Sequence, residues 1–218
     1  MIEATENQAH YLGSVMRRSI GDTIHLFNGT DGEWTCRIAA LSRGKASFAV
    51  ETLVRPQQGD SDLWLLFAVL KRDTTDLVVQ KATELGVSAL LPVFTERTNA
   101  GRVNLDRLRA IAVEAAEQSE RLTVPEVRPA RQLHEILADW PAERALFVAQ
   151  ERANAQPLGR HNGPAGLLIG PEGGFGPRDH MVLDRCRFIR PVTLGPRILR
   201  AETAAIVGLA LLQAPGCG

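Results

Sequence analysis

Cysteine is scarce in this sequence, and no metal-binding spacing is present. The 218 residues include three cysteines, Cys36, Cys186 and Cys217, which lie far apart and form no C-x-x-C pair. The five histidines are equally scattered, with no H-E-x-x-H spacing. An odd number of isolated cysteines indicates reduced thiols in a cytosolic protein and argues against a disulfide framework or a zinc site. We therefore expect neither a disulfide nor a metal.

Long apolar runs and an excess of charge of either sign are also missing. No stretch of roughly 18 apolar residues could span a membrane, and the first ten residues lack the charged and apolar regions of a signal peptide. Lysine and arginine together number 25, as do aspartate and glutamate, so the formal net charge is zero. RNA-binding proteins usually carry a basic excess, so the overall charge argues weakly against RNA. The 44% hydrophobic content supports a packed core, and we expect a soluble, cytoplasmic protein without a membrane segment.

The residues that are present follow two different rhythms, which predict two domains. Residues 21–54 alternate apolar and polar positions around Asn28-Gly29 and Asp31-Gly32, a strong signal for β-hairpins. After the polar stretch 56–61, apolar runs alternate with helical patterns, as in a parallel α/β domain. We place the domains at residues 1–57 and 62–218. The predicted strands are 63–70, 88–94, 145–148, 166–169 and 191–194, and the predicted helices are 75–86, one capped by Asn104 that runs to about Ser119, and 201–213.

Two glycine-rich breaks near the end of the chain are its most informative feature. LLIGPEGGFG (167–176) and VTLGPRILRAET (192–203) each stop an apolar run at glycine and proline. Glycine permits positive φ and lets a ligand lie against the main chain, whereas proline ends strand pairing. Neither break matches G-x-G-x-x-G or G-x-x-x-x-G-K-[ST], so a Rossmann or P-loop phosphate site is not supported. Ligands gather at the carboxyl ends of strands in open α/β sheets, so both breaks should lie at one edge. Ordinary turns are the alternative.

Four segments together resemble one known family. KRDTTDLVVQKATELGVSALLPVFTERT (71–98), EAAEQSERLTVPEV (114–127), IGPEGGF and LGPRILRAETA stand in the order found in the bacterial 16S rRNA uracil-N3 methyltransferases, the RsmE family of the SPOUT superfamily. The resemblance implies a C-terminal α/β domain with a parallel sheet and a deep trefoil knot, an exception to the usual avoidance of knots. It also implies a small N-terminal PUA-like β-barrel that binds RNA. The family usually has a first strand before the segment that begins at His10, and only nine residues precede it here. That strand is therefore expected to be short or absent, which leaves closure of the barrel open.

The resemblance also implies that the knot binds S-adenosylmethionine. Close chain-to-chain approach is then expected at Gly170, Gly174 and Gly195, with apolar walls around the adenine. Core packing is an equal alternative for Ile198 and Leu199. The family usually has threonine where this chain has Ala201, and Thr203 is a candidate to replace it. The residues assigned to the cofactor are Ile169, Gly170, Gly174, Leu194, Gly195, Ile198, Leu199 and Thr203.

Methyl transfer to uracil N3 makes two chemical demands. The displacement is in line, so the enzyme must position both reactants, and N3 must lose a proton. We expect Arg200 to stabilise the developing uracil anion, with Glu172 and Glu202 as the nearby carboxylates. A structural ion pair of Arg200 with either glutamate is the alternative. The general base is not identified by the sequence.

The expected RNA contacts come from scattered cations. They are Arg17, Arg18, Lys71, Arg72, Arg97 and Arg121. Each pair of cations could instead be ordinary solvated surface. The segment that begins at Lys71 could be explained by Asp73, which stabilises the start of a helix. Arg121 could lie on an ordinary helix surface. A paired uridine cannot be methylated at N3, so the target must be unpaired or flipped out.

The resemblance implies 16S rRNA in the small ribosomal subunit as substrate, and a homodimer. The small-residue face of the last helix (Ala204, Ala205, Gly208, Ala210) is compatible with close packing in a dimer or inside one chain. Two other functions stay open: a knotted methyltransferase for another RNA position, and an inert RNA-binding factor of ribosome assembly.

Overall fold

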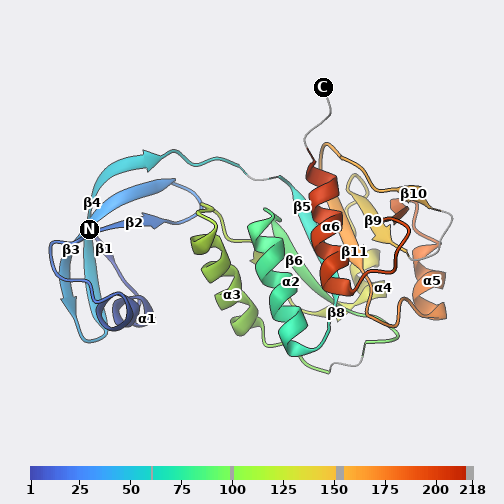
Figure 1. Cartoon of the computed structure of the whole chain (residues 1–218), viewed down its shortest axis with the longest axis horizontal. Coiled ribbons are helices and arrows are strands. Elements are labelled where there is room, and N and C mark those ends of the chain that lie inside the picture. Colours follow the sequence, from blue (N-terminus) through green and yellow to red (C-terminus); the bar gives the residue numbers. More distant parts are fainter. Residues whose placement is uncertain (60, 99–100, 151–154, 215–218) are drawn as a thin grey trace. The chain divides into compact units, whose positions relative to one another are not determined.

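The computed structural model describes residues 1–59, 61–98, 101–150 and 155–214, and it divides into two compact units, Met1–Gly59 and Asp60–Gly218 (Figure 1). In these described ranges no helix is long and apolar enough to cross a membrane, and no cluster of histidine, cysteine, aspartate or glutamate could hold a metal ion. Cys217 lies outside the described residues.

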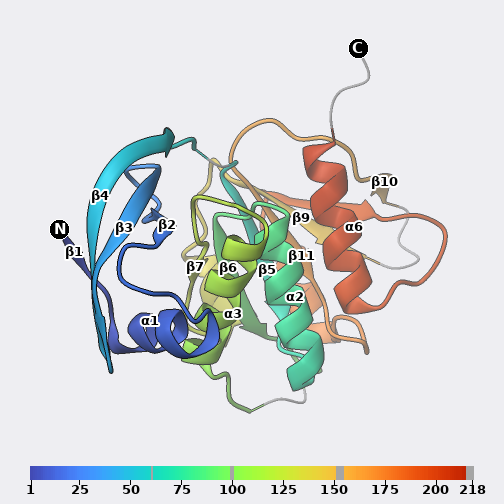
Figure 2. The same ribbon diagram turned by 60° about the vertical axis from the view of Figure 1, so that its left-hand side comes forward.

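The first unit is built on a four-stranded antiparallel sheet in the order β1-β4-β3-β2. Its strands are β1 (Ile2–Glu3), β2 (Thr23–Phe27), β3 (Glu33–Ser42) and β4 (Lys45–Arg55). The predicted turn between β2 and β3 is confirmed, because the Asn28 side chain accepts hydrogen bonds from the N–H groups of Thr30 and Asp31, both at 2.9 Å. The first strand is present but has only two residues, which pair with β4 (Figure 2). Within residues 1–59, β1 and β2 are the two edges of the sheet, so strand pairing alone does not close it into a barrel.

The core of the first unit lies between this sheet and a short helical segment. Helix α1 (Glu6–His10) begins with a capping box, in which Thr5 and Gln8 bond each other's backbone N–H groups. A π-helical turn (Tyr11–Val15) follows and adds Leu12 to the core. Cys36 is fully buried there, and this burial raises the pKa of its thiol. The cysteine therefore serves as a small apolar core residue, as expected for a reduced thiol.

The second unit is an α/β domain whose strand pairs are all parallel. The order is β10-β12-β9-β11-β5-β6-β7, and β8 also pairs with β6. The strands are β5 (Leu63–Ala68), β6 (Ala89–Phe94), β7 (Glu126–Val127), β8 (Arg131–Gln132), β9 (Ala145–Ala149), β10 (Gln156–Pro157), β11 (Ala165–Ile169) and β12 (Ile189–Thr193). The predicted parallel sheet is thus confirmed.

Helices cover both faces of this sheet. Leu65 and Leu167 share a core with α2 (Arg72–Glu84), α3 (Leu105–Gln118) and α6 (Ala201–Gln213). Their neighbours Leu66 and Leu168 share the other core with α4 (Leu133–Ala138) and α5 (Pro177–Leu183). Successive side chains of a strand point to opposite faces, so burial of both faces requires the continuous apolar runs seen in the sequence.

Two helix starts show how local chemistry sets the boundaries. Asn104 caps α3 as predicted, accepting a hydrogen bond from the Arg107 N–H at 3.0 Å. Helix α2 begins at Arg72, before the predicted residue 75. Thr75 lies inside its first turn, where its buried hydroxyl bonds both the N–H and the carbonyl oxygen of Leu70 at 3.2 Å.

The small-residue face of α6 packs inside the chain. A Cβ added at Gly208 would lie 2.6 Å from Cδ2 of Leu167 on β11, and Ala204 and Ala205 are buried. Packing within one chain therefore accounts for these positions, while Ala210 is exposed. Dimerisation stays a prediction.

Candidate cofactor and RNA site

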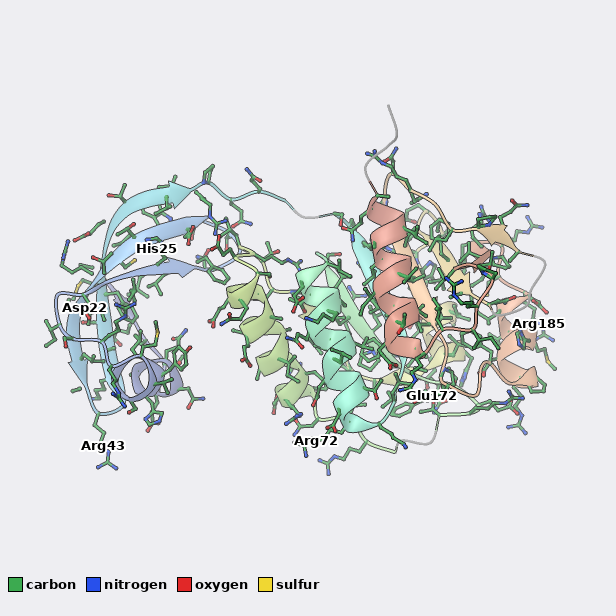
Figure 3. The ribbon with its side chains drawn as sticks, in the orientation of Figure 1. Asp22, His25, Arg43, Arg72, Glu172 and Arg185 are labelled. Atoms are coloured by element: carbon green, nitrogen blue, oxygen red, sulfur yellow. The ribbon has the colours of Figure 1, made fainter. Side chains whose placement is uncertain are left out.

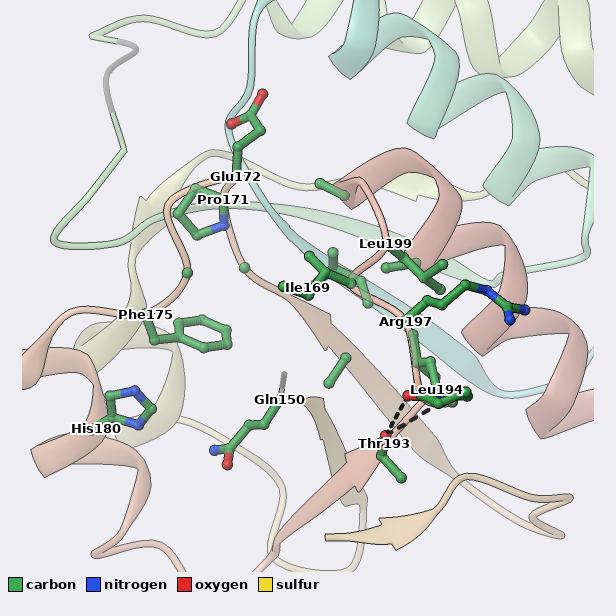
Figure 4. Close-up of a pocket in the computed structure, with 18 residues that line it drawn as sticks. Gln150, Ile169, Pro171, Glu172, Phe175, His180, Thr193, Leu194, Arg197 and Leu199 are labelled. Atoms are coloured by element: carbon green, nitrogen blue, oxygen red, sulfur yellow. Dashed lines mark hydrogen bonds between the residues drawn. The ribbon is translucent and has the colours of Figure 1, made fainter. Parts of the chain in front are cut away.

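Two loops of the α/β unit meet at the carboxyl edge of its sheet. Residues 170–176 follow β11 and lead into α5, and residues 194–200 follow β12 and lead into α6. Strand β9 lies between β11 and β12, and all three run parallel, so both loops leave the sheet at the same edge, as expected. Together they enclose a cavity of about 840 Å³, the cofactor cavity (Figure 4).

Most of the residues assigned to a cofactor line this cavity. The sequence-predicted residues on its wall are Ile169, Gly170, Glu172, Gly174, Leu194, Gly195, Ile198 and Leu199. Arg200, Glu202 and Thr203 are not among the lining residues, although Leu199 and Ala201 on either side of Arg200 are.

Several lining residues were missed by the sequence reasoning. Gln150, Phe175 and His180 all face the cavity (Figure 4). Gln150 follows β9, so the rule that ligands gather at the carboxyl ends of strands could have found it. Phe175 and His180 carry no such signal, because they reach the cavity through the path of the loop and the start of α5.

The glycines of the two loops are needed for different reasons. At Gly170 an added Cβ would lie 3.1 Å from the ring of Phe175 in the same loop, so this position is crowded by a side chain and not by another stretch of main chain. The predicted chain-to-chain approach is wrong for Gly174 and Gly195, where no atom beyond the two chain neighbours lies within 4 Å of an added Cβ. These two have φ of +69° and +122°, which side chains disfavour. Hydrogen bonds of the Thr193 hydroxyl to the N–H (3.3 Å) and carbonyl oxygen (3.2 Å) of Gly195 hold the second loop.

The turn after β6 clamps the first glycine-rich loop. Arg97 donates through Nη1 to the carbonyl oxygen of Gly173 at 2.5 Å. The Glu96 carboxylate accepts a hydrogen bond from the Arg178 N–H at 2.8 Å at the start of α5. An added Cβ at Gly176 would clash with that carboxylate, so any other residue here would displace the Glu96 side chain from its hydrogen bond to Arg178.

Asp179 completes this clamp from the other side. Its side chain is buried, and it accepts hydrogen bonds from the N–H groups of Gly176 at 2.9 Å and Glu96 at 3.1 Å. Residues 95–98 and 173–179, far apart in sequence, are thereby joined by reciprocal bonds. We refer to these contacts as the loop clamp.

The predicted RNA-binding cations fall into different environments. Arg17 and Arg18 are exposed in the first unit, and Arg17 has a positive φ of 54°. Lys71 and Arg72 are exposed where α2 begins. The guanidinium of Arg121 instead donates to the carbonyl oxygens of Thr83 (2.8 Å) and Val87 (2.6 Å), so its geometry serves packing and gives no support to an RNA contact.

A second cavity, of about 830 Å³, lies beside the cofactor cavity and shares Pro171 and Glu172 with it. We call it the basic cavity. Its cationic side chains come from three stretches of the chain and are Lys71, Arg72, Arg97, Arg102 and Arg107. Its carboxylates are Asp76 and Glu172.

Comparison with protein families places both units. Residues 57–213 match the model of an RNA methyltransferase domain, and residues 4–51 match that of an RNA methyltransferase PUA domain. The ribosomal RNA small subunit methyltransferase E of Rickettsia conorii is 31% identical over 218 residues, covering 98% of this chain and 89% of that protein. The chain belongs to this family. The Synechocystis protein of the same name is 32% identical and covers 98% of this chain and 73% of its own length.

Solved structures of similar proteins agree in fold. The ribosomal RNA small subunit methyltransferase E of Neisseria gonorrhoeae, crystallised with S-adenosyl methionine, has 30% sequence identity and a TM-score of 0.85, covering 96% of this chain and 89% of its own. A Legionella pneumophila protein solved with the same cofactor has 27% identity and a TM-score of 0.87, covering 98% and 91%. The predicted fold, a SPOUT α/β domain preceded by a PUA-like domain, is confirmed.

Proposed function

We propose that this protein uses S-adenosylmethionine to methylate N3 of a specific uridine in the 16S rRNA of the small ribosomal subunit. The cofactor cavity carries the proposal. Both glycine-rich loops line this cavity, and the chain belongs to the small-subunit rRNA methyltransferase family. Two similar proteins were solved with this cofactor. Since the substrate is a ribosomal subunit, we place the protein in the cytoplasm.

The cavity fits the proposed cofactor in size and chemistry. Its volume of about 840 Å³ lies within the range of small-molecule sites. Ile169, Leu194 and Leu199 supply apolar walls for an adenine, and Gly174 and Gly195 leave room for a ligand beside the main chain, since nothing beyond their chain neighbours lies within 4 Å of an added Cβ. When bound, the cofactor supplies an electrophilic methyl group on a sulfonium.

Three residues are proposed to serve the transfer itself. Glu172 is exposed on the wall shared by the two cavities, and its carboxylate points away from Gln150 and Thr193 (Figure 4). We propose that it receives the uracil N3 proton, with Glu202 as the second carboxylate. Arg200 is exposed directly before α6 and, within the described residues, makes no ion pair with either glutamate. Its guanidinium is thus available to stabilise the uracil anion.

The other proposed contacts follow from this assignment. Arg17 and Arg18 on the PUA-like unit, and Lys71 and Arg72 on the α/β unit, would hold the RNA around the flipped-out uridine. A homodimer would present each of these basic surfaces twice, so the local positive potential could hold RNA although the net charge of the chain is zero.

The first test is methylation of small ribosomal subunits from a strain that lacks the enzyme. Subunits are incubated with the purified protein and S-adenosylmethionine, and the 16S rRNA is digested and analysed by mass spectrometry. N3-methyluridine at one site is expected. Methylation elsewhere would identify an enzyme for another RNA position, and failure to bind the cofactor despite tight RNA binding would indicate an inert assembly factor.

The role of Arg200 has a separate test. Arg200→Ala should lower kcat at saturating subunits while the Kd for the cofactor, measured by calorimetry, stays within about twofold, because its neighbours and not Arg200 line the cavity. Full turnover by this variant would contradict the role.

A further inference from the structure

The basic cavity concentrates charge in a chain that carries none overall. Five cationic side chains and two carboxylates line it, although the chain has 25 residues of each sign. Gathering like charges costs stability, because each cation raises the electrostatic energy of the others. Surface that is merely solvated does not account for an 830 Å³ recess assembled from four separate segments.

The five cations differ in what they already bind. Arg107 forms an ion pair with Asp76, with its Nε at 3.1 Å from both carboxylate oxygens. This hydrogen bonding raises the pKa of Arg107. Arg97 is held by the loop clamp. Lys71, Arg72 and Arg102 are exposed and make no ion pair with any described carboxylate. These three charges are free for an anionic ligand.

The floor and the shared wall indicate what kind of anion fits. Leu70 and Leu108 form a buried apolar floor, which suits the sugar or base of a nucleotide better than a small free ion. Pro171 and Glu172 line both this cavity and the cofactor cavity, so a nucleotide held here would lie next to the cofactor cavity.

We propose that the basic cavity binds phosphodiester groups of single-stranded RNA next to the target uridine, with Lys71, Arg72 and Arg102 as the phosphate ligands. Arg102 thereby becomes an RNA-binding residue. The inference rests on the proposed function for the identity of the strand, whereas the anion site itself rests on the cavity and its charges. Cation-to-phosphate contacts of this kind position a nucleic acid without reading its sequence.

The test uses two single variants and a matched control. Lys71→Gln and Arg102→Gln each remove one cation from the basic cavity. Arg185→Gln removes an exposed arginine that follows the C-terminal end of α5, does not line the basic cavity and lies away from Arg72 and Glu172 (Figure 3). The probe is a fluorescently labelled single-stranded RNA oligonucleotide that contains uridine. Its binding is measured by anisotropy over a range of salt concentrations, and S-adenosylmethionine binding is measured by calorimetry.

Each cavity variant is expected to weaken RNA binding by roughly fourfold at 0.15 M salt and to reduce the salt slope by about 0.7, the amount for one phosphate contact on a single strand. Cofactor affinity should stay unchanged, and Arg185→Gln should change neither. RNA affinities of both cavity variants equal to that of Arg185→Gln would overturn the proposal.

A competition arm separates RNA from free phosphate as the ligand. Inorganic phosphate is expected to displace the oligonucleotide only in large excess over it. Tighter binding of inorganic phosphate than of RNA, lost in both cavity variants, would show a free-phosphate site and overturn the RNA assignment. Because these readouts are binding constants, they stand apart from the methylation test of the proposed function.

Discussion

The cofactor cavity and the basic cavity are nearly equal in volume, about 840 and 830 Å³, yet they are built in different ways. Most residues that line the cofactor cavity belong to the two glycine-rich loops that follow strands. The basic cavity is shaped by charged side chains on and before α2 and α3. Replacing a loop glycine should therefore change cofactor binding in the first cavity, and removing a cation should change RNA binding in the second.

The two cavities are joined by a small set of contacts. Pro171 and Glu172 form their shared wall, and the loop clamp ties the turn beside the basic cavity to the loop that bounds the cofactor cavity. A substitution in the clamp should therefore affect both cavities, whereas one in either wall should affect only its own.

The largest effect is expected from Asp179→Ala, which breaks the loop clamp. The N–H groups of Gly176 and Glu96 lose their acceptor in a largely buried place, at a cost of about 2–3 kcal/mol in the free energy of unfolding. Affinity for both S-adenosylmethionine and RNA should fall. Urea unfolding gives the stability, and hydrogen exchange of the two amides reports the local loss.

Asp184→Ala is the control for this prediction. Asp184 is an exposed acid at the other end of α5, and its loss should change stability by less than about 0.5 kcal/mol. If Asp179→Ala were equally mild, the clamp would not hold the two cavities together.

The next effect separates the cavities. Gly195→Val forces a branched side chain to φ of +122°, which costs about 1–3 kcal/mol of strain or moves the loop. The Kd for S-adenosylmethionine should rise about tenfold or more, while binding of the RNA oligonucleotide stays unchanged. Gly163→Val is a matched control, because Gly163 also has a positive φ (+108°) and an open Cβ position but does not line the cavity. Equal cofactor affinities in the two variants would contradict the assignment.

The glycines also show where sequence reasoning succeeds and fails. The breaks at 170–176 and 194–200 located the cofactor cavity, because glycine and proline after apolar runs mark loops at the edge of a sheet. The predicted reason, close approach of two stretches of main chain, was not found: Gly170 is crowded by the Phe175 ring, and Gly174 and Gly195 have positive φ. A position without room for a side chain and a position with positive φ both select glycine. The sequence therefore cannot tell that Gly174 has a positive φ whereas Gly176 packs closely against Glu96, and the coordinates are needed for that.

Fold and site differ in how local their signals are. Alternating strands, the Asn104 cap and the continuous apolar runs are set by neighbours in sequence, and the predicted parallel sheet followed from them. The loop clamp joins residues 76 and 83 positions apart, and no periodicity encodes such pairs. Arg97 and Arg121 were both predicted as RNA-binding cations, yet both guanidinium groups bind backbone carbonyls.

A smaller effect is expected in the wall of the basic cavity. Thr75→Val keeps the shape of the side chain but leaves the buried N–H and carbonyl oxygen of Leu70 without the hydroxyl, at a cost of about 1–2 kcal/mol of stability. Cofactor affinity should be unchanged. Thr83→Val tests the same change on the same helix, where the buried hydroxyl bonds only the Val79 carbonyl oxygen of the preceding turn, and it should cost less. If the two variants lost equal amounts of unfolding free energy, the hydrogen bonds of Thr75 to Leu70 would contribute no more than the single bond of Thr83 to Val79.

The smallest effect tests where the basic cavity ends along α3, and it depends on pH. The loss of hydration and, next, the charge of Glu114 raise the pKa of Glu117 above its ordinary value of 4.5. The folded chain then binds this proton more tightly than the unfolded chain. The resulting stability is present below the ordinary pKa and is lost as pH rises through the raised one.

Glu117→Gln should therefore stabilise the protein at neutral pH by less than about 0.5 kcal/mol, because the site is largely solvated. This difference in the free energy of urea unfolding should disappear below pH 4.5, where the protonated Glu117 is as neutral as the glutamine that replaces it. RNA affinity should not change, since Arg107 and Leu108 line the basic cavity and Glu117 does not. A tighter RNA complex in this variant would mean that the acidic end of α3 acts on the same strand, so the basic cavity could not be treated as a self-contained site.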